Sequence, residues 1–308
     1  MSGAILGTSA QAAPAEPSEV TALWPSGPPG GIPAGLEQAM SDRAAPGAPA
    51  DRAVTRIVRP TLSLFRPARP DGSAVLLIPG GSYERVVVDK EGFETARWLA
   101  ERGVVAFVLL YRLPGDGWAA GPDAPLQDAQ RALRLVRSRA ADLGFDTART
   151  GVLGFSAGGH LAARLATRFE AETYPGVDAT DALSPRPDFA GLLYPVVSMR
   201  EGVAHPRSRE RLIGASPSEA AIAAYSADEG VGAGTPPTFL TLALDDESVP
   251  PENSFRMLAA LRRAKIAAEL HAFEAGGHGF GLRKAEGLPA AAWPDLLHRW
   301  GRRHGWFA

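Results

Sequence analysis

The chain has 308 residues, 45% of them hydrophobic, which is enough to bury a core as one large α/β domain or two small ones. Its formal net charge of −2 and pI near 6.3 lack the basic field that nucleic acid or an anionic membrane surface requires, so neither partner is expected. The absence of cysteine excludes disulfides, a thiolate nucleophile and cysteine-ligated metal centres.

The first residues leave the cellular compartment open. Ala10-Gln11-Ala12 has the A-x-A form of a signal-peptidase site, but the residues before it include no basic region and few apolar residues. Either residues 1–14 are the remnant of a secretory signal of a periplasmic or secreted protein, or they are the Ala-rich tail of a cytoplasmic one. No segment approaches the roughly 20 apolar residues of a membrane-spanning helix, so no membrane span is predicted.

Residues 1–51 are predicted to form an irregular N-terminal arm, followed by a single domain at 52–308. The arm is rich in Pro, Gly and Ala and shows neither the period of a strand nor that of a helix. Trp24 is expected to pin it to the core. Residues 52–60 and 61–65 then alternate apolar with polar side chains, which predicts strands of an antiparallel edge.

The rest of the chain alternates apolar runs with amphipathic segments. Strands are predicted at 74–78, 104–110, 150–153, 188–194, 237–244 and 268–273. Helices are predicted at 91–102, 125–143, 160–163, 216–224, 252–264 and 290–302. This alternation predicts the α/β class, with a mostly parallel, doubly wound sheet covered by helices on both faces.

Residues 154–158 read Gly-Phe-Ser-Ala-Gly, a G-x-S-x-G motif between a predicted strand and a predicted helix. On such a turn, called a nucleophile elbow, the Ser hydroxyl stands at the carboxyl edge of the sheet, within reach of a base and a substrate carbonyl. The motif alone is common. Its strand-to-helix context makes Ser156 the candidate nucleophile.

Acyl transfer through a serine also needs a base and a group that orients the base. The strand that ends at residue 244 is followed by Asp245, Asp246 and Glu247, and the strand that ends at residue 273 is followed by the glycine-flanked His278. Acidic turns and such histidines are ordinary loop features when taken singly. The carboxyl ends of parallel strands meet at one edge, however, and the chain order Ser, acid, His is that of α/β-hydrolases.

The remaining sequence features argue against metal chemistry. His160 lies four residues after Ser156 and is predicted to pack inside the fold, and no ligand spacing such as H-E-x-x-H occurs. No metal or cofactor is therefore expected. The turn at 79–83 reads Pro-Gly-Gly-Ser-Tyr, and its backbone N–H groups are candidate oxyanion donors together with that of Ala157. An ordinary tight turn is the alternative interpretation.

These motifs together resemble a known family. The chain is similar to α/β-hydrolase esterases of the acetyl-xylan esterase or xylanase-associated type, and the similarity covers roughly residues 53–304. The motifs that carry it are Pro79-Gly80-Gly81-Ser82-Tyr83, Tyr111-Arg112-Leu113-Pro114, Gly154-Phe155-Ser156-Ala157-Gly158-Gly159-His160, Asp245-Asp246-Glu247-Ser248-Val249-Pro250 and Gly276-Gly277-His278-Gly279-Phe280-Gly281.

The resemblance implies a serine carboxylic-ester hydrolase that removes acetyl or other short acyl groups from carbohydrate, so the partner is a small-molecule or oligosaccharide ester. The family's D-x-x-V-P turn selects Asp246 as the acid, and its oxyanion loop maps onto Gly81 and Ser82. Two positions depart from the family pattern: Pro79 stands where relatives carry His, and Ser82 where they carry Gly.

Two aromatic residues are candidate substrate contacts. Tyr83 and Trp118 lie on loops that follow predicted strands, where they could stack on a sugar ring or simply pack the loop. The segment 205–212 is a candidate cap over the site, with its arginines in solvent.

Two other functions share these motifs. A serine peptidase of the prolyl-oligopeptidase type normally carries a large accessory domain, for which this chain has no room. A non-catalytic, hydrolase-like receptor would not need every triad element.

Overall fold

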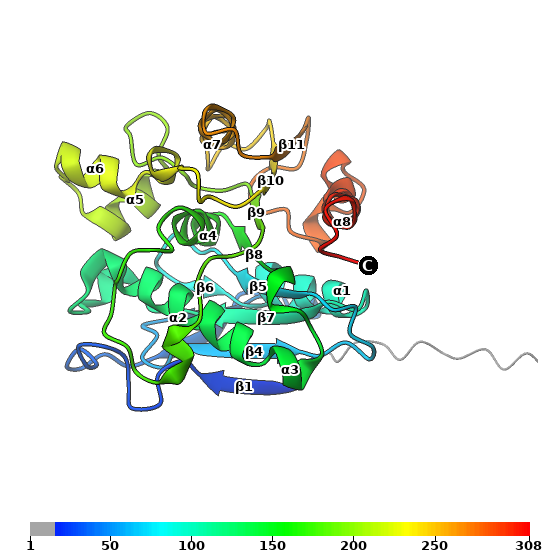
Figure 1. Cartoon of the computed structure of the whole chain (residues 1–308). Coiled ribbons are helices and arrows are strands. Elements are labelled where there is room, and N and C mark those ends of the chain that lie inside the picture. Colours follow the sequence, from blue (N-terminus) through cyan, green and yellow to red (C-terminus); the bar gives the residue numbers. More distant parts are fainter. Residues whose placement is uncertain (1–15) are drawn as a thin grey trace, which may run out of the picture.

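The computed structural model describes residues 16–308, and its centre is an eight-stranded sheet in the order β1-β4-β7-β5-β8-β9-β10-β11 (Figure 1). Its strands are β1 (Glu19–Ala22), β4 (Thr61–Phe65), β5 (Ala74–Ile78), β7 (Val105–Leu110), β8 (Thr150–Phe155), β9 (Ala190–Leu193), β10 (Thr238–Ala243) and β11 (Ala268–Phe273). From β7 to β11 the neighbouring strands run parallel, whereas β1 and β4 pair antiparallel at one edge. The predicted mostly parallel sheet is confirmed.

Helices cover both faces of this sheet. They are α1 (Glu94–Ala100), α2 (Ala124–Ser138), α3 (Ala140–Leu143), α4 (Ala157–Thr167), α5 (Pro206–Ile213), α6 (Glu219–Tyr225), α7 (Glu252–Arg263) and α8 (Trp293–Arg303). A π-helical turn, η1 (Asp89–Phe93), precedes α1. Short 3₁₀ turns are η2 (Pro114–Asp116), η3 (Gly121–Asp123), η4 (Thr147–Arg149), η5 (Ala179–Ala182), η6 (Ala227–Gly230), η7 (Arg283–Ala285) and η8 (Pro289–Ala292).

The direction of each crossover assigns the helices to a face. From β5 the chain moves to β7 in one direction through α1, and then to β8 in the other direction through α2. Because parallel crossovers are right-handed, α1 and α2 lie on opposite faces. The crossovers through α4 and α7 run in the same direction as that through α2, so α4 and α7 lie on the same face as α2. The last helix, α8, lies beside α1 on the other face, where the Trp98 and Trp293 ring centroids are 6.5 Å apart.

The prediction of an irregular arm is wrong in part, and the predictions for residues 1–14 concern a segment outside the described residues. Two short strands occur in the arm. β1 extends the central sheet, and β2 (Ala39–Asp42) is an edge strand of a second, antiparallel sheet in which β3 (Arg52–Thr55) pairs with β2 on one side and with β6 (Val86–Val87) on the other. Neither shows a buried stripe, so pairing with a neighbouring strand stabilises it. Trp24 does anchor the arm, because it is 5% exposed and its indole N–H donates to Asp128 at 2.8 Å.

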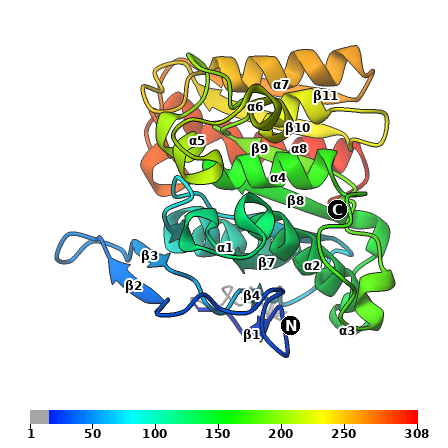
Figure 2. The same ribbon diagram turned by 90° about the vertical axis from the view of Figure 1, so that its left-hand side faces the viewer.

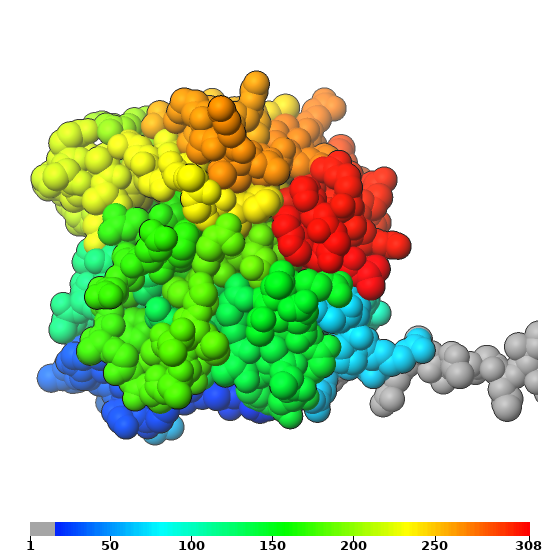
Figure 3. Space-filling model, viewed as in Figure 1, coloured from blue at the N-terminus to red at the C-terminus, as the bar shows by residue number. Residues whose placement is uncertain are grey.

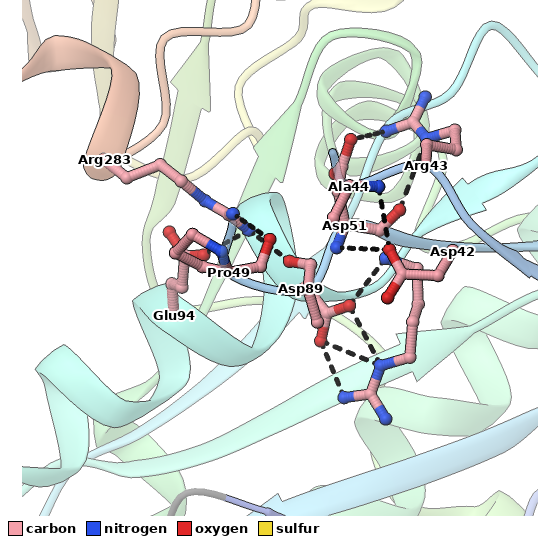
Figure 4. Close-up of polar contacts among 10 residues, drawn as sticks. Asp42, Arg43, Ala44, Pro49, Asp51, Asp89, Glu94 and Arg283 are labelled. Atoms are coloured by element: carbon pink, nitrogen blue, oxygen red, sulfur yellow. Dashed lines mark hydrogen bonds and ion pairs between the residues drawn. The ribbon is translucent and has the colours of Figure 1, made fainter. Parts of the chain in front are cut away.

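The β2–β3 hairpin stands out from the body, as Figure 2 shows, and ionic contacts hold its base. The Arg52 guanidinium donates two hydrogen bonds to the Asp89 carboxylate, from Nη2 to Oδ1 at 2.7 Å and from Nε to Oδ2 at 2.9 Å. Arg283 donates to the carbonyls of Pro49 and Ala50 and pairs with Glu94 (Figure 4). The loop of the hairpin is thereby attached both to α1 and to the segment that follows β11.

The parallel strands all end at the same edge of the sheet. The α5–α6 segment stands over that edge, where it forms the yellow corner of the molecule in Figures 1 and 3. The loops after β5, β7, β8, β10 and β11 meet beneath it, and they carry the residues described next.

Candidate active site

Ser156 occupies the sharp turn between β8 and α4. Its backbone has φ 54° and ψ −120°, a region that a residue with a side chain enters only when the surrounding structure holds it there. The side chain is almost buried, with 5% of the residue exposed. This geometry is that of a nucleophile elbow, with the hydroxyl above the carboxyl end of the central strand.

A continuous chain of hydrogen bonds links three side chains at this edge. The Ser156 Oγ lies 2.8 Å from the His278 Nε2, and the His278 Nδ1 lies 2.7 Å from the Asp246 Oδ2. The other Asp246 oxygen accepts the backbone N–H groups of Ser248 and Val249, at 2.9 Å each. A carboxylate in this position favours the tautomer with its proton on Nδ1, which leaves Nε2 free to accept the Ser156 proton.

The neighbouring carboxylates of Asp245 and Glu247 form no hydrogen bond with His278 and have other environments. Asp245 accepts the N–H groups of Gly276 and Gly277 at 3.0 and 2.8 Å, so it holds the loop that leads to His278. Glu247 is exposed. Of the three acidic residues that the sequence offers in this turn, Asp246 is the one the structure brings to His278.

The turn at 79–83 lies directly against the nucleophile. A methyl group on Gly80 would lie 2.8 Å from the Ser156 Cβ and 2.6 Å from the Phe155 carbonyl oxygen, so only glycine fits. Within residues 16–308, the N–H groups of Gly81, Ser82 and Ala157 donate to no protein acceptor.

Two buried tyrosines anchor this turn. The Tyr111 hydroxyl donates to the Pro79 carbonyl at 2.9 Å, and the Tyr83 hydroxyl lies 2.7 Å from the His160 Nδ1. The His160 Nε2 is 2.7 Å from the Tyr225 carbonyl, which can only accept, so Nε2 carries the proton and Nδ1 accepts from Tyr83. Burial lowers the pKa of His160 to about 3 and keeps the ring neutral. His160 is packed inside the fold, as the sequence predicts.

The prediction that Tyr83 and Trp118 stack on a sugar is wrong. Tyr83 is 1% exposed and Trp118 is 3% exposed, and the Arg112 guanidinium lies over the Trp118 ring at 5.1 Å. A sugar can stack only on a ring face that solvent reaches. The alternative interpretation, that both side chains pack their loops, is the correct one.

The segment 205–212 is tied to the turn beside the nucleophile. Glu84 accepts Arg207 at 2.6 Å and Arg211 at 2.7 Å, so the two arginines join α5 to the loop after β5. His205 begins this helix, and its pKa is lowered by burial first and by the nearby His278 second. Segment 205–212 is therefore joined by ion pairs to the loop after β5, which includes the turn beside Ser156.

The described part of the chain lacks two features of other kinds of site. Residues 16–308 contain no group of three or more His, Asp or Glu side chains arranged to hold a metal ion. None of their helices has the length and apolar character that a bilayer crossing requires.

The sheet order, the elbow and the Ser–His–Asp hydrogen bonds together define an α/β-hydrolase. Residues 62–261 match the BD-FAE family, and the chain belongs to this family. The resemblance to acetyl-xylan esterases is confirmed by an acetylxylan esterase of Xylanibacter ruminicola, which is 34% identical over 223 residues. That match covers 71% of this chain and 43% of the relative, so the chain spans less than half the length of that protein.

Two solved structures are similar over most of both chains. An acetyl ester-xyloside bifunctional hydrolase from Caldicellulosiruptor lactoaceticus is 34% identical, with a TM-score of 0.77 over 95% of this chain and 98% of the other. A Thermogutta terrifontis esterase with bound propionate is 29% identical, with a TM-score of 0.68 over 82% of this chain and 92% of the other. Each of these proteins is named as an ester hydrolase or esterase.

Proposed function

We propose that this protein is a serine carboxylic-ester hydrolase in which Ser156 is the nucleophile, His278 the general base and Asp246 the residue that orients the base. The observation that carries the proposal is the unbroken chain of hydrogen bonds from the Ser156 hydroxyl through His278 to Asp246. The names of the similar proteins support the same reaction.

The reaction follows from this geometry in two halves. In the first half, the His278 Nε2 takes the proton from Ser156 as its Oγ attacks the ester carbonyl, and then passes that proton to the departing alcohol. In the second half, water attacks the acyl-enzyme, with His278 again as base. In both halves a negative charge develops on the carbonyl oxygen. The N–H groups of Ala157 and of Gly81 or Ser82 donate hydrogen bonds to that oxygen and stabilise the charge.

We further propose that the substrate is an acetyl or other short acyl ester carried on a carbohydrate. This proposal is supported by what the similar proteins are named for: an acetylxylan esterase, an acetyl ester-xyloside hydrolase and an esterase with bound propionate. The aromatic rings that the sequence suggests for sugar stacking are buried, so this proposal does not rely on them for sugar recognition.

The test combines labelling with an ester panel. A fluorophosphonate should label the wild-type chain at Ser156 and leave Ser156→Ala unlabelled, and Ser156→Ala should fold normally and lose turnover. The wild type should prefer acetyl over longer acyl esters and should release acetate from acetylated xylan. Full activity in Ser156→Ala would refute the nucleophile, whereas absence of labelling in the wild type would indicate a hydrolase-like receptor. A preference for long acyl chains would refute the substrate class alone.

A further inference from the structure

Glu91 is a buried carboxylate that the proposed reaction does not use. It lies in the π-helical turn η1 with 4% of its surface exposed, and within residues 16–308 it forms no ion pair. The nearby cation is its sequence neighbour Lys90, which interacts electrostatically with Glu91; a methyl group on Gly279 would lie 3.2 Å from the Lys90 Nζ and 3.5 Å from the Glu91 Oε1. Burying a carboxylate costs several kcal/mol unless a nearby charge and hydrogen bonds compensate for the lost water. The hydrogen-bond partners of its two carboxylate oxygens therefore indicate the role of this buried side chain.

One oxygen holds the turn beside the nucleophile. The Glu91 Oε2 accepts the Gly80 N–H at 2.8 Å. With the Tyr111 hydroxyl on the Pro79 carbonyl, this bond fixes the peptides at the start of the turn. The next two N–H groups, of Gly81 and Ser82, are then left without protein acceptors, at the place where the turn packs against Ser156. The Gly80 N–H is thus occupied by Glu91, and the two N–H groups that follow it in the turn are free to bind another acceptor.

The other oxygen reaches the loop that carries the base. The Glu91 Oε1 accepts the Tyr194 hydroxyl at 3.1 Å, and the same hydroxyl accepts the Gly281 N–H at 3.2 Å. The Tyr194 ring packs edge-on against His278, with ring centroids 5.2 Å apart. A methyl group on Gly279, the residue after His278, would lie 3.5 Å from the Glu91 Oε1, so this loop also lies against the carboxylate.

We infer that Glu91 is a positioning residue that holds the oxyanion turn and the His278 loop in their relative placement. It acts through Gly80 and Tyr194 and touches no reacting atom. The inference rests on the proposed ester hydrolysis, because that reaction uses the N–H group of Gly81 or Ser82 as an oxyanion donor. Transition-state stabilisation by such donors depends on their being fixed before the reaction begins.

The test compares three substitutions of this residue with a neighbouring control. Glu91→Ala leaves the Gly80 N–H without its acceptor, and kcat per fluorophosphonate-labelled site should fall on the order of 10²-fold with KM changed by less than about threefold. Glu91→Gln keeps an oxygen for Gly80 and should recover kcat to within about tenfold of wild type. Glu94→Ala removes a carboxylate three residues further on, which pairs with Arg283, and should change kcat by less than about twofold.

The outcomes separate this inference from the proposed function. Wild-type kcat in Glu91→Ala, or an equal loss of kcat in Glu94→Ala, would overturn the positioning role. If Glu91→Ala does not fold, Glu91→Asp replaces it, because the shorter side chain keeps the charge and should still lower kcat without raising KM. Activity of Ser156→Ala would instead refute the proposed function. A loss of thermal stability in Glu91→Ala with unchanged kcat per labelled site would show a structural role only and would also overturn the inference.

Discussion

The neutral, buried His160 makes the stability of the fold depend on pH. It is 0% exposed, and its pKa is lowered from the ordinary 6.5 to about 3 by burial. Between these two values the unfolded chain binds a proton at this ring and the folded chain does not. The free energy of unfolding therefore falls as the pH falls from about 6.5 towards 3, and the contribution of His160 is fully present above pH 6.5.

The size of this effect follows from the two pKa values. Each pH unit between them is worth about 1.4 kcal/mol, so lowering the pH from about 7 to 5 should cost the wild type about 2 kcal/mol through His160 alone. Other groups titrate over the same range, so the useful quantity is the difference between the wild type and a variant that lacks the titrating ring.

His160→Gln supplies that comparison. A glutamine can accept the Tyr83 hydroxyl with its carbonyl oxygen and donate to the Tyr225 carbonyl with its amide, but it takes up no proton. Urea unfolding of both proteins at pH 8, 7 and 5 should give a nearly constant difference in stability between pH 8 and 7. Between pH 7 and 5 the wild type should lose about 2 kcal/mol more than the variant. Parallel losses down to pH 5 would refute the argument that His160 is held neutral.

Three further substitutions and one control test the chemistry of the site and the packing of the fold. Gly80→Ala should lower the free energy of unfolding in urea by about 1–3 kcal/mol and kcat on the order of 10²-fold, because the added methyl meets backbone and Ser156. Gly232→Ala, where a methyl meets open space, should change stability by less than about 0.5 kcal/mol, and an equal effect of both would contradict this account. Asp246→Asn should lower kcat on the order of 10⁴-fold in steady-state ester assays with the fold intact, and an unchanged kcat would exclude it as the acid. Asp128→Asn leaves the fully buried Arg112 without its counter-charge and should destabilise the protein by about 3–5 kcal/mol in urea, so wild-type stability would show that the pair is not needed.

Much of the fold could be predicted from sequence because its parallel strands are long apolar runs between clear helical segments. The strands β5 and β8 are buried along their whole length, which is the pattern that a sheet covered on both faces requires. The places of Ser156, Asp246 and His278 could be predicted for a related reason. Each lies just beyond a strand end, and in a parallel sheet these ends share one edge.

The remaining features depend on tertiary packing that no local pattern records. The strands β1 and β2 are four residues each and mostly exposed, so only their partners make them strands. Tyr83 and Trp118 lie on the loops where the sequence places them, but it does not reveal that their rings face inward.

Glu91 is the first residue of the segment 91–102, which the sequence predicts to be an amphipathic helix. The structure instead begins that segment with the π-helical turn η1, which changes the direction of its side chains and places Glu91 inside the fold.

The edge position of β1 means that the unit that folds is larger than the segment by which the family is recognised. A fragment limited to residues 62–261 would contain Ser156 and Asp246 but not His278, and it would begin inside β4. It would lack β1, which covers the hydrogen-bonding edge of β4, and α8, whose Trp293 packs against Phe155 at 6.3 Å between ring centroids. An uncovered strand edge pairs readily with other chains, so such a fragment should aggregate on expression.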